Sequence, residues 1–396
     1  MLTPLITFVL SAVLLYIPPV QRWAIDQATT YASDEFGMDI RIDRVRVSFP
    51  LDLELQGLQV IHQEETLGSM GSMVVDLDLM RILLLQIRIE GIELKDLDVE
   101  TGNLIESVRI NGNLKRIFLK AEQINLLDAN VSLAQASIEG GDVTICLADT
   151  TAADTTESSP LPWTIGIEKV RLDRLNLSLQ MPLDSLDLGL QIREGELNDG
   201  NIDLLQGIYQ ADDIHIKTDT IRYNAQTDTL KHAGIDFSQI LLTEASLQLN
   251  NPFYNQTSNA AGASLMLTAK ERCGLAIDTL SANIGLDSTK VWADDLLLKT
   301  PFTRIEAATH IGLATFRTQG TGKIDAQILG NIGNEDIRYF VANHLQEDEL
   351  KALPQAPLHL NVNANGTTDL LQINQCKLSM PEIIDAHLEG SLSNVK

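Results

Sequence analysis

Apolar and polar residues alternate through most of the chain that follows Gly37. Leu53 and Leu55, for example, are separated by Glu54, and this period of two places apolar side chains on one side of an extended strand. The alternation returns along the chain at Val75/Leu77/Leu79, Ile87/Ile89, Ile92/Leu94, Leu97/Val99, Val143/Ile145/Leu147, Leu175/Leu177/Leu179, Leu186/Leu188/Leu190/Ile192, Ile214/Ile216, Leu247/Leu249 and Leu358/Leu360/Val362. Helical segments do not alternate with these strands to supply crossovers, so the sequence predicts a mainly β protein with an extended, curled antiparallel sheet.

The alternation is itself interrupted in a regular way. An apolar-x-apolar triplet is followed by two polar residues and then by another such triplet, for example within residues 89–99 and 170–179. No repeat of fixed length accompanies this pattern, so the repetition is structural rather than literal.

Two longer interruptions divide the body of the chain. Residues 148–162 are Ala, Thr, Asp, Ser and Glu with Leu161 as the one bulky apolar residue, which predicts a flexible polar loop between two modules, 38–147 and 163–396. Residues 334–353 carry Ile337, Phe340, Val341 and Leu345 at helical spacing before Pro354. They predict an amphipathic helix lying against the sheet.

The apolar side of such a sheet must be covered, and the short helical segments are too few to cover it. A second sheet, as in a sandwich, is one solution. A sheet that curls into a groove open to lipid chains is the other, and periodicity does not separate the two. Candidate residues for the lining of an apolar groove are Leu53, Leu55, Val75, Leu77, Leu177, Leu188 and Leu190.

The N-terminus carries no charged residue from Leu2 to Val20, which predicts a transmembrane anchor over residues 1–20. A cleaved signal peptide would have basic residues before the apolar run and a small-x-small site after it, and neither is present. Val20, Trp23, Ala24 and Tyr31 recur at roughly helical spacing. Residues 21–37 are therefore expected to form an amphipathic helix that Gly37 ends.

Composition argues against several functions. A net charge of −25 disfavours nucleic acid as a partner. Aspartate pairs such as Asp76/Asp78 and Asp96/Asp98 alternate with leucines and indicate the solvated side of a strand. The 7 histidines and 3 cysteines show no metal-ligand or nucleophile spacing, and the segment Gly320 to Lys323 does not match a phosphate-binding loop. We therefore expect no cofactor, no metal and no enzymatic activity.

The pattern resembles the TamB-like branch of the AsmA-like family of Gram-negative envelope proteins. The resemblance rests on the anchor, the short helix ending at Gly37, the segment IRIDRVRVSFPLDLELQGLQV, the Leu-rich residues 83–99, the polar loop before Pro162 and Trp163, IEKVRLDRLNLSLQ and LLLKTPFTRIEA. It covers most of the chain by pattern and hydropathy rather than by invariant residues.

The resemblance implies an inner-membrane anchor and a periplasmic β-groove, or taco-shaped sheet, that moves phospholipid or assists outer-membrane protein assembly. Phospholipid acyl chains and a barrel of the TamA or BamA type are the implied partners. The chain stops in mid-pattern and is expected to be a fragment. A scaffold that presents a sheet edge to a nascent barrel strand, or a packed structural β-protein, is the alternative.

Overall fold

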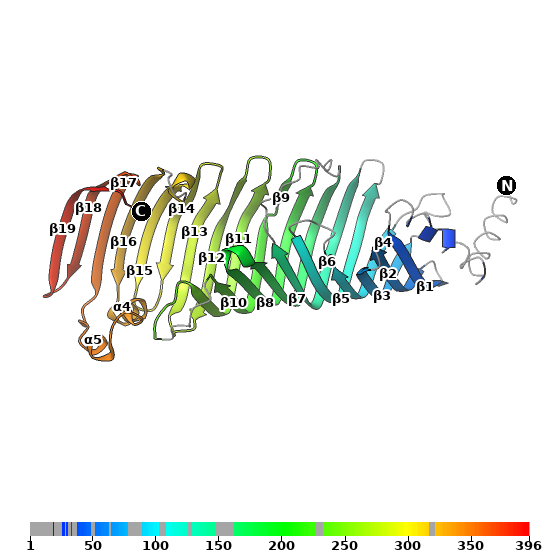
Figure 1. The fold of residues 1–396 in the computed structure, drawn as a ribbon, viewed down its shortest axis with the longest axis horizontal. Coiled ribbons are helices and arrows are strands. Elements are labelled where there is room, and N and C mark those ends of the chain that lie inside the picture. Colours follow the sequence, from blue (N-terminus) through cyan, green and yellow to red (C-terminus); the bar gives the residue numbers. More distant parts are fainter. Residues whose placement is uncertain are drawn as a thin grey trace. The chain divides into compact units, whose positions relative to one another are not determined.

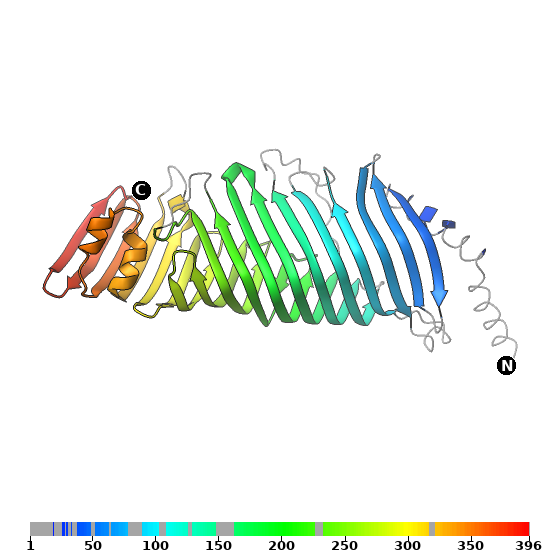
Figure 2. The same ribbon diagram turned by 90° about the horizontal axis from the view of Figure 1, so that it is seen from below.

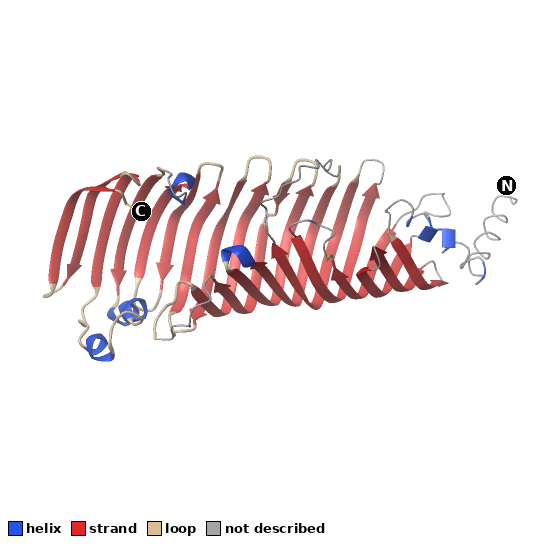
Figure 3. Cartoon of the chain, viewed as in Figure 1, coloured by secondary structure: helices blue, strands red, loops and turns tan. Residues whose placement is uncertain are grey.

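In the computed structural model, the described residues are 38–48, 52–62, 65–77, 89–102, 108–125, 129–147, 162–225, 233–316 and 321–395, with Pro19, Asp26, Gln27, Thr29, Thr30 and Ser33. The chain divides into two compact units, Met1–Glu196 (unit 1) and Leu197–Lys396 (unit 2). Figure 3 shows that strands dominate each unit and that helices are restricted to short segments. The mainly β fold with a large antiparallel sheet, predicted from the alternation, is confirmed.

Unit 1 is built from long strands that follow one another in the sheet. Its strands are β1 (Asp39–Ser48), β2 (Asp52–His62), β3 (Glu65–Leu77), β4 (Ile89–Glu100), β5 (Val108–Asn125), β6 (Asn130–Leu147), β7 (Thr164–Met181) and the first part of β8 (Leu186–Asp203). Each strand from β1 to β5 pairs antiparallel with the next. Chain neighbours are thus sheet neighbours, as expected when short connections join consecutive strands.

One pairing departs from the predicted antiparallel meander. β6 and β7 run parallel, with Asn130 paired to Thr164 and Cys146 to Gln180. A parallel pair needs a connection that returns along the strand, commonly of about a dozen residues or more. Residues 148–163 supply it, so the polar segment predicted as a boundary between modules connects two paired strands of unit 1. The division of the structure at Glu196 and Leu197 differs from the predicted modules 38–147 and 163–396.

Where two polar residues interrupt the alternation, each strand has one residue that is left out of the pairing, here called a bulge, and the register is the same on both sides of it. In β1 and β2, Ile42 pairs with Leu58 and Val45 with Leu55, while Asp43 and Gly57 have no directly paired residue. The same interruption recurs in each following strand up to β7. There Glu139 pairs with Asp173 and Gly141 with Leu175, while the residues between them, Gly140 and Arg174, are not directly paired. Positive φ angles fall along this line at Gly57, Asp96, Gly140 and Arg174. A bulge adds one residue to a strand and bends it, so the aligned bulges mark a line of bending across unit 1.

Unit 2 continues with shorter strands. They are β9 (Ile208–Gln210), β10 (Asp213–Asn224), β11 (Gln239–Asn255), β12 (Ala260–Glu271), β13 (Ala276–Leu286), β14 (Lys290–Lys299), β15 (Arg304–Gly312), β16 (Lys323–Ile332), β17 (Leu358–Thr367), β18 (Leu370–Met380) and β19 (Ile384–Ser393). From β10 to β19 each strand pairs antiparallel with the next, and β9 pairs with both β11 and the end of β8. Two 3-10 turns, Pro182–Asp184 and Leu313–Phe316, complete the described elements outside the helices.

The helix predicted within residues 334–353 is present but divided. α4 (Asn334–Val341) and α5 (Glu347–Lys351) both lie between β16 and β17 (Figure 1). A second N-terminus forms at Gln346, whose capping box with Glu349 satisfies backbone groups there. α4 contacts other loops of unit 2: the Ile235 amide donates to the Tyr339 carbonyl at 2.8 Å, and Phe237 stacks on Phe340. The apolar periodicity therefore located the helical segment without showing where the chain would turn.

The predicted anchor over residues 1–20 and most of the predicted helix over residues 21–37 lie outside the described residues. Within the second range, Asp26, Gln27, Thr29, Thr30 and Ser33 are helical. Among the residues that the structure describes, no helix is long and apolar enough to span a membrane.

Candidate functional site

The apolar side chains of unit 1 share one side of its sheet, here called the apolar face. Because directly paired residues point to the same side, the pairings trace rows of apolar side chains across the strands. One row comprises Val45, Leu55, Met73, Leu94, Ile117, Ile138 and Leu172. The row beyond the bulge line comprises Ile42, Leu58, Met70, Leu97, Leu114, Gly141 and Leu175. The apolar face is therefore continuous from β1 to β7.

Burial on the apolar face is uneven and does not follow the distance from the bulge line. Val75 and Leu133, away from the line, are each 8% exposed, whereas Leu94 and Ile117 in a row beside the line are half-buried. Met70 and Leu175, directly beside it, are 7% and 3% exposed, whereas Leu177, two residues further along β7, is 36% exposed. Ile145 in β6 is also 36% exposed. A packed sandwich would bury such residues almost fully, because protein interiors are close-packed. Every described element of the unit beyond residue 38 is a strand of the sheet or a 3-10 turn, so no described layer there covers this face.

The opposite side of the sheet, the polar face, carries ion pairs along the bulge line. Arg116 in β5 lies between two carboxylates, with its Nε 2.6 Å from Glu93 and its Nη1 3.1 Å from Glu139. Burial raises the pKa of Glu93, but the hydrogen bonds from Arg116 and Lys95 outweigh it and leave the pKa below its ordinary value. Alternating charges thus link β4, β5 and β6 across the bulges, on the side away from the aliphatic rows.

The predicted groove residues all lie in unit 1. Leu53, Leu55 and Val75 occupy the apolar face on β2 and β3, where Leu53 pairs with Val75. Leu77 follows Val75 by two residues and pairs with Ile89 at the end of β3. Leu177 pairs with Val143 in the row beyond Leu175.

Leu188 and Leu190 occupy one side of β8 together with the buried Ile192. Exposed Arg193 and Glu194 follow, and then Gly195, where an added Cβ would lie 3.2 Å from the Leu172 side chain. The two polar residues between Ile192 and Gly195 match the bulges of the neighbouring strands. Leu188 and Leu190 are therefore assigned to the apolar face.

Several residues of the apolar face were not among the predicted ones. Met70, Leu97, Leu114 and Leu175 lie beside the bulge line, and strict alternation would assign them to the opposite side from Met73, Leu94, Ile117 and Leu172. The recurring pair of polar residues is the sequence feature that could have identified these residues. One extra residue in a strand brings apolar residues three positions apart, instead of two, to the same side of the sheet.

The described residues include few side chains arranged for metal binding or nucleophilic chemistry. They contain no cluster of three or more His, Cys, Asp or Glu side chains able to hold a metal ion. The three cysteines are free thiols, and burial beside Glu271 raises the pKa of Cys273 to about 11, which makes its thiolate scarce at neutral pH. The arrangement in unit 1 instead presents hydrocarbon surface.

No family model matches the chain, and a search of the curated proteins found no match.

Proposed function

We propose that unit 1 is an apolar groove that holds the acyl chains of phospholipids. The observation that carries the proposal is the continuous apolar face, which no described layer of unit 1 covers and on which Leu177 and Ile145 remain 36% exposed. Figures 1 and 2 show the long strands of this unit curving rather than running flat. A sheet bent at aligned bulges towards its apolar side has a floor along the bend and walls on either side, which is the geometry of a groove.

The aliphatic rows suit a hydrocarbon ligand on energetic grounds. Burying one methylene contributes about 0.8 kcal/mol, so roughly eight methylenes of one acyl chain contribute about 6 kcal/mol before the costs of ordering. The rows contain no charged residue on the apolar face, so a chain sliding along them would meet no buried charge. This supports reversible occupancy and movement along the groove.

The place of the groove in the cell is part of the same proposal and rests on the resemblance to TamB-like proteins. Residues 1–20 would anchor the chain in the Gram-negative inner membrane, with the sheet in the periplasm. Phospholipid would then pass towards the outer membrane, with an outer-membrane barrel of the TamA or BamA type as partner. Support for outer-membrane protein assembly rests on the resemblance alone.

Photocrosslinking tests the groove directly. A benzophenone amino acid placed at Leu55 or at Leu177 should form adducts with phospholipid in envelope preparations, detected by mass spectrometry of the purified chain. The matched control is Arg171, an exposed residue of the same strand as Leu177 that points to the polar face. It should give no lipid adduct.

A charged residue in the groove completes the test. Leu177→Asp should reduce the lipid adduct at Leu55 and lower the melting temperature by only a few degrees, because Leu177 is already partly exposed. Absence of lipid adducts at both apolar positions, together with collapse of the melting transition in the Leu177→Asp variant, would show a packed structural protein instead.

A further inference from the structure

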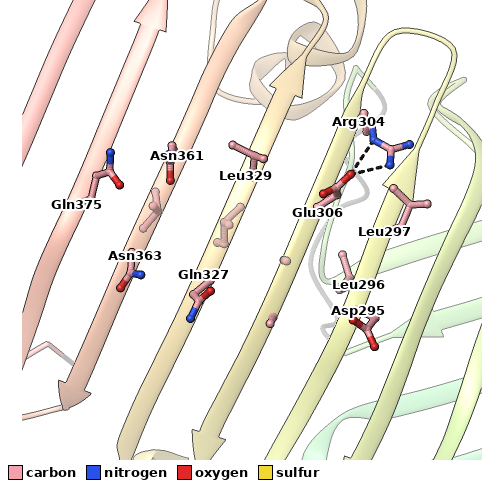
Figure 4. A pocket seen from close by; sticks show the side chains of 14 residues that line it. Asp295, Leu296, Leu297, Arg304, Glu306, Gln327, Leu329, Asn361, Asn363 and Gln375 are labelled. Atoms are coloured by element: carbon pink, nitrogen blue, oxygen red, sulfur yellow. Dashed lines mark hydrogen bonds and ion pairs between the residues drawn. The ribbon is translucent and has the colours of Figure 1, made fainter.

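The polar face of unit 2 carries two adjoining depressions over β14 to β18. Their volumes are about 520 Å³ and 490 Å³. Both are lined by Arg304, Glu306, Leu329 and Asn361, so they form one trough that crosses the strands. Figure 4 shows the side chains of the larger depression on neighbouring strands. The trough belongs to unit 2 and plays no part in the proposed lipid groove of unit 1.

Side-chain amides line the trough. Gln327 in β16 pairs with Asn363 in β17, which pairs with Gln375 in β18, and Asn361 lies two residues from Asn363. Among the described residues, Gln327, Asn361 and Gln375 make no side-chain hydrogen bond, while Asn363 accepts one from Asn374 at 2.8 Å. Asn361, Asn363 and Gln375 are half-buried. The trough therefore holds several amide groups whose hydrogen-bonding capacity the protein leaves unused.

On the polar face of unit 1, two side-chain amides donate hydrogen bonds to neighbouring carboxylates. There Asn113 donates to Asp98, and Asn176 donates to Asp142 at 2.6 Å. The depression on that face is lined by Asp98, Glu100 and Asp142 and is strongly acidic. Asn111, which also lines that depression, makes no side-chain hydrogen bond among the described residues, so a free amide is not peculiar to unit 2. The trough of unit 2 is distinct in bringing three of them together.

The chemistry of the trough indicates a neutral ligand rich in hydroxyl groups. An amide offers both donors and an acceptor, which matches hydroxyl groups that donate and accept. The charged residues of the trough balance: Arg304 and Glu306 pair at 2.6 Å, and Asp295 and Lys377, which also line it, are of opposite charge. Leu329, 56% exposed, and Leu297 offer apolar surface to the C–H face of a sugar ring. Convergent polar groups beside apolar surface are typical of small-ligand sites.

The direction of the trough adds the last constraint. It crosses neighbouring strands, which lie about 4.8 Å apart. This spacing is close to the repeat of one pyranose ring in an extended chain, so successive rings would meet successive strands. We infer that the polar face of unit 2 is a binding site for a neutral, linear oligosaccharide, held by the amides of Gln327, Asn361 and Gln375.

Nuclear magnetic resonance of the full chain tests the site. The probes are cellohexaose, maltohexaose and chitohexaose, each added up to about 10 mM, a range that detects weak binding. At least one should shift the side-chain amide signals of Gln327, Asn361 and Gln375, and should leave the Asn113 amide unmoved. If none of the three probes shifts these signals, the inference is overturned.

Variants then assign the binding to the amides. The double substitution Asn361→Ala and Gln375→Ala should weaken binding about tenfold, because it removes two hydrogen-bonding groups from the site. Asn113→Ala in unit 1 is the matched control and should leave binding unchanged. Leu329→Ser tests the apolar contact without touching the amides, and should also weaken binding.

Equal binding by the wild-type chain and by both trough variants would refute the site. Lipid crosslinking at Leu55 and Leu177 would be unaffected in every case, so the two proposals fail separately.

Discussion

The two units follow the same alternating pattern but differ in where their strand pairing is irregular. In unit 1 the bulges align from β1 to β7 with the register kept, and large aliphatic residues such as Met70, Leu97 and Leu175 stand beside them. In unit 2 the register itself shifts in the pairs β11–β12, β12–β13, β13–β14, β14–β15, β17–β18 and β18–β19, whereas β15–β16 and β16–β17 have no shift. Alternation alone predicts neither kind of irregularity.

The side chains beside these irregular positions differ as well. A row of unit 2 that adjoins its register shifts comprises Ala293, Thr309, Ala326, Ala364, Ile373 and Gly390. Small side chains fill most of this row, whereas unit 1 places Leu, Ile and Met beside its bulges. A second row of unit 2 is mostly aliphatic and comprises Val291, Ile311, Ile324, Gly366, Leu371 and Leu392. The units therefore differ in the side chains beside their irregular positions, and not in whether their sheets carry aliphatic rows.

The largest expected effect concerns the floor of unit 1. Leu175→Asp should destabilise the unit by about 4 kcal/mol or more, because it removes a buried aliphatic side chain and buries a charge. Leu177→Asp, two residues away and 36% exposed, should cost about 1 kcal/mol. Urea denaturation followed by circular dichroism measures both. Similar large losses for the two variants would mean that the apolar face is covered.

Glycine substitutions compare the bent and the straight strands. Gly141 in β6 has φ 149°, and an added Cβ would lie 2.1 Å from the Asn113 carbonyl oxygen. Gly141→Ala should therefore cost about 3 kcal/mol, because backbone would have to move.

Gly330 in β16 is the matched position of unit 2, where a Cβ would meet the Ile305 side chain at an ordinary 3.4 Å. Gly330→Ala should change stability by no more than about 0.5 kcal/mol in either direction. Thermal unfolding measures the loss of stability in both variants. An equal loss would contradict the idea that the bulge line requires a backbone conformation that favours glycine.

The helices distinguish unit 2 from the described strands of unit 1. Asp336 in the first turn of α4 is 2% exposed and accepts a hydrogen bond from the Thr300 hydroxyl. Asp336→Ala should cost about 2 kcal/mol, because the buried Thr300 hydroxyl loses the acceptor of its hydrogen and the helix N-terminus loses a negative charge. The exposed neighbour Glu335 provides the control, since Glu335→Ala should cost less than about 0.5 kcal/mol. Loss of protease resistance around residues 233–238 would report release of α4, and equal costs for both variants would contradict its anchoring role.

The smallest effect depends on pH. Asp76 in unit 1 has its pKa raised by burial and by the carboxylates of Asp52, Glu90 and Glu93, and it pairs directly with Asp52. A raised pKa means that ionised Asp76 opposes folding, and this penalty grows as the pH rises from the ordinary aspartate value through the raised one. Asp76→Asn should stabilise the chain by about 0.5 kcal/mol at neutral pH and by nothing below about pH 3, as measured by melting temperature. Equal stabilisation at both pH values would exclude charge as the cause.

The sequence by itself determined the mainly β fold, the two sides of each stretch of strict alternation and the position of the helical segment. Alternation is a local property, because neighbouring residues of an extended chain point to opposite sides whatever they pair with. The residues Leu53, Leu55, Val75 and Leu177 could therefore be assigned to one apolar side before any pairing was known. The two polar residues between apolar triplets were also visible, although their meaning was not.

Only the tertiary structure decided what those interruptions do and how the strands are ordered. A bulge bends its own strand, and the bends form one line only when neighbouring strands bulge at facing positions. This alignment links Gly57 with residues far along the chain such as Asp96 and Arg174. The parallel pairing of β6 with β7 likewise depends on which strand edge the chain meets after residue 163. The amide trough of unit 2 arises the same way, because Gln327, Asn363 and Gln375 become neighbours through strand pairing and not through sequence spacing.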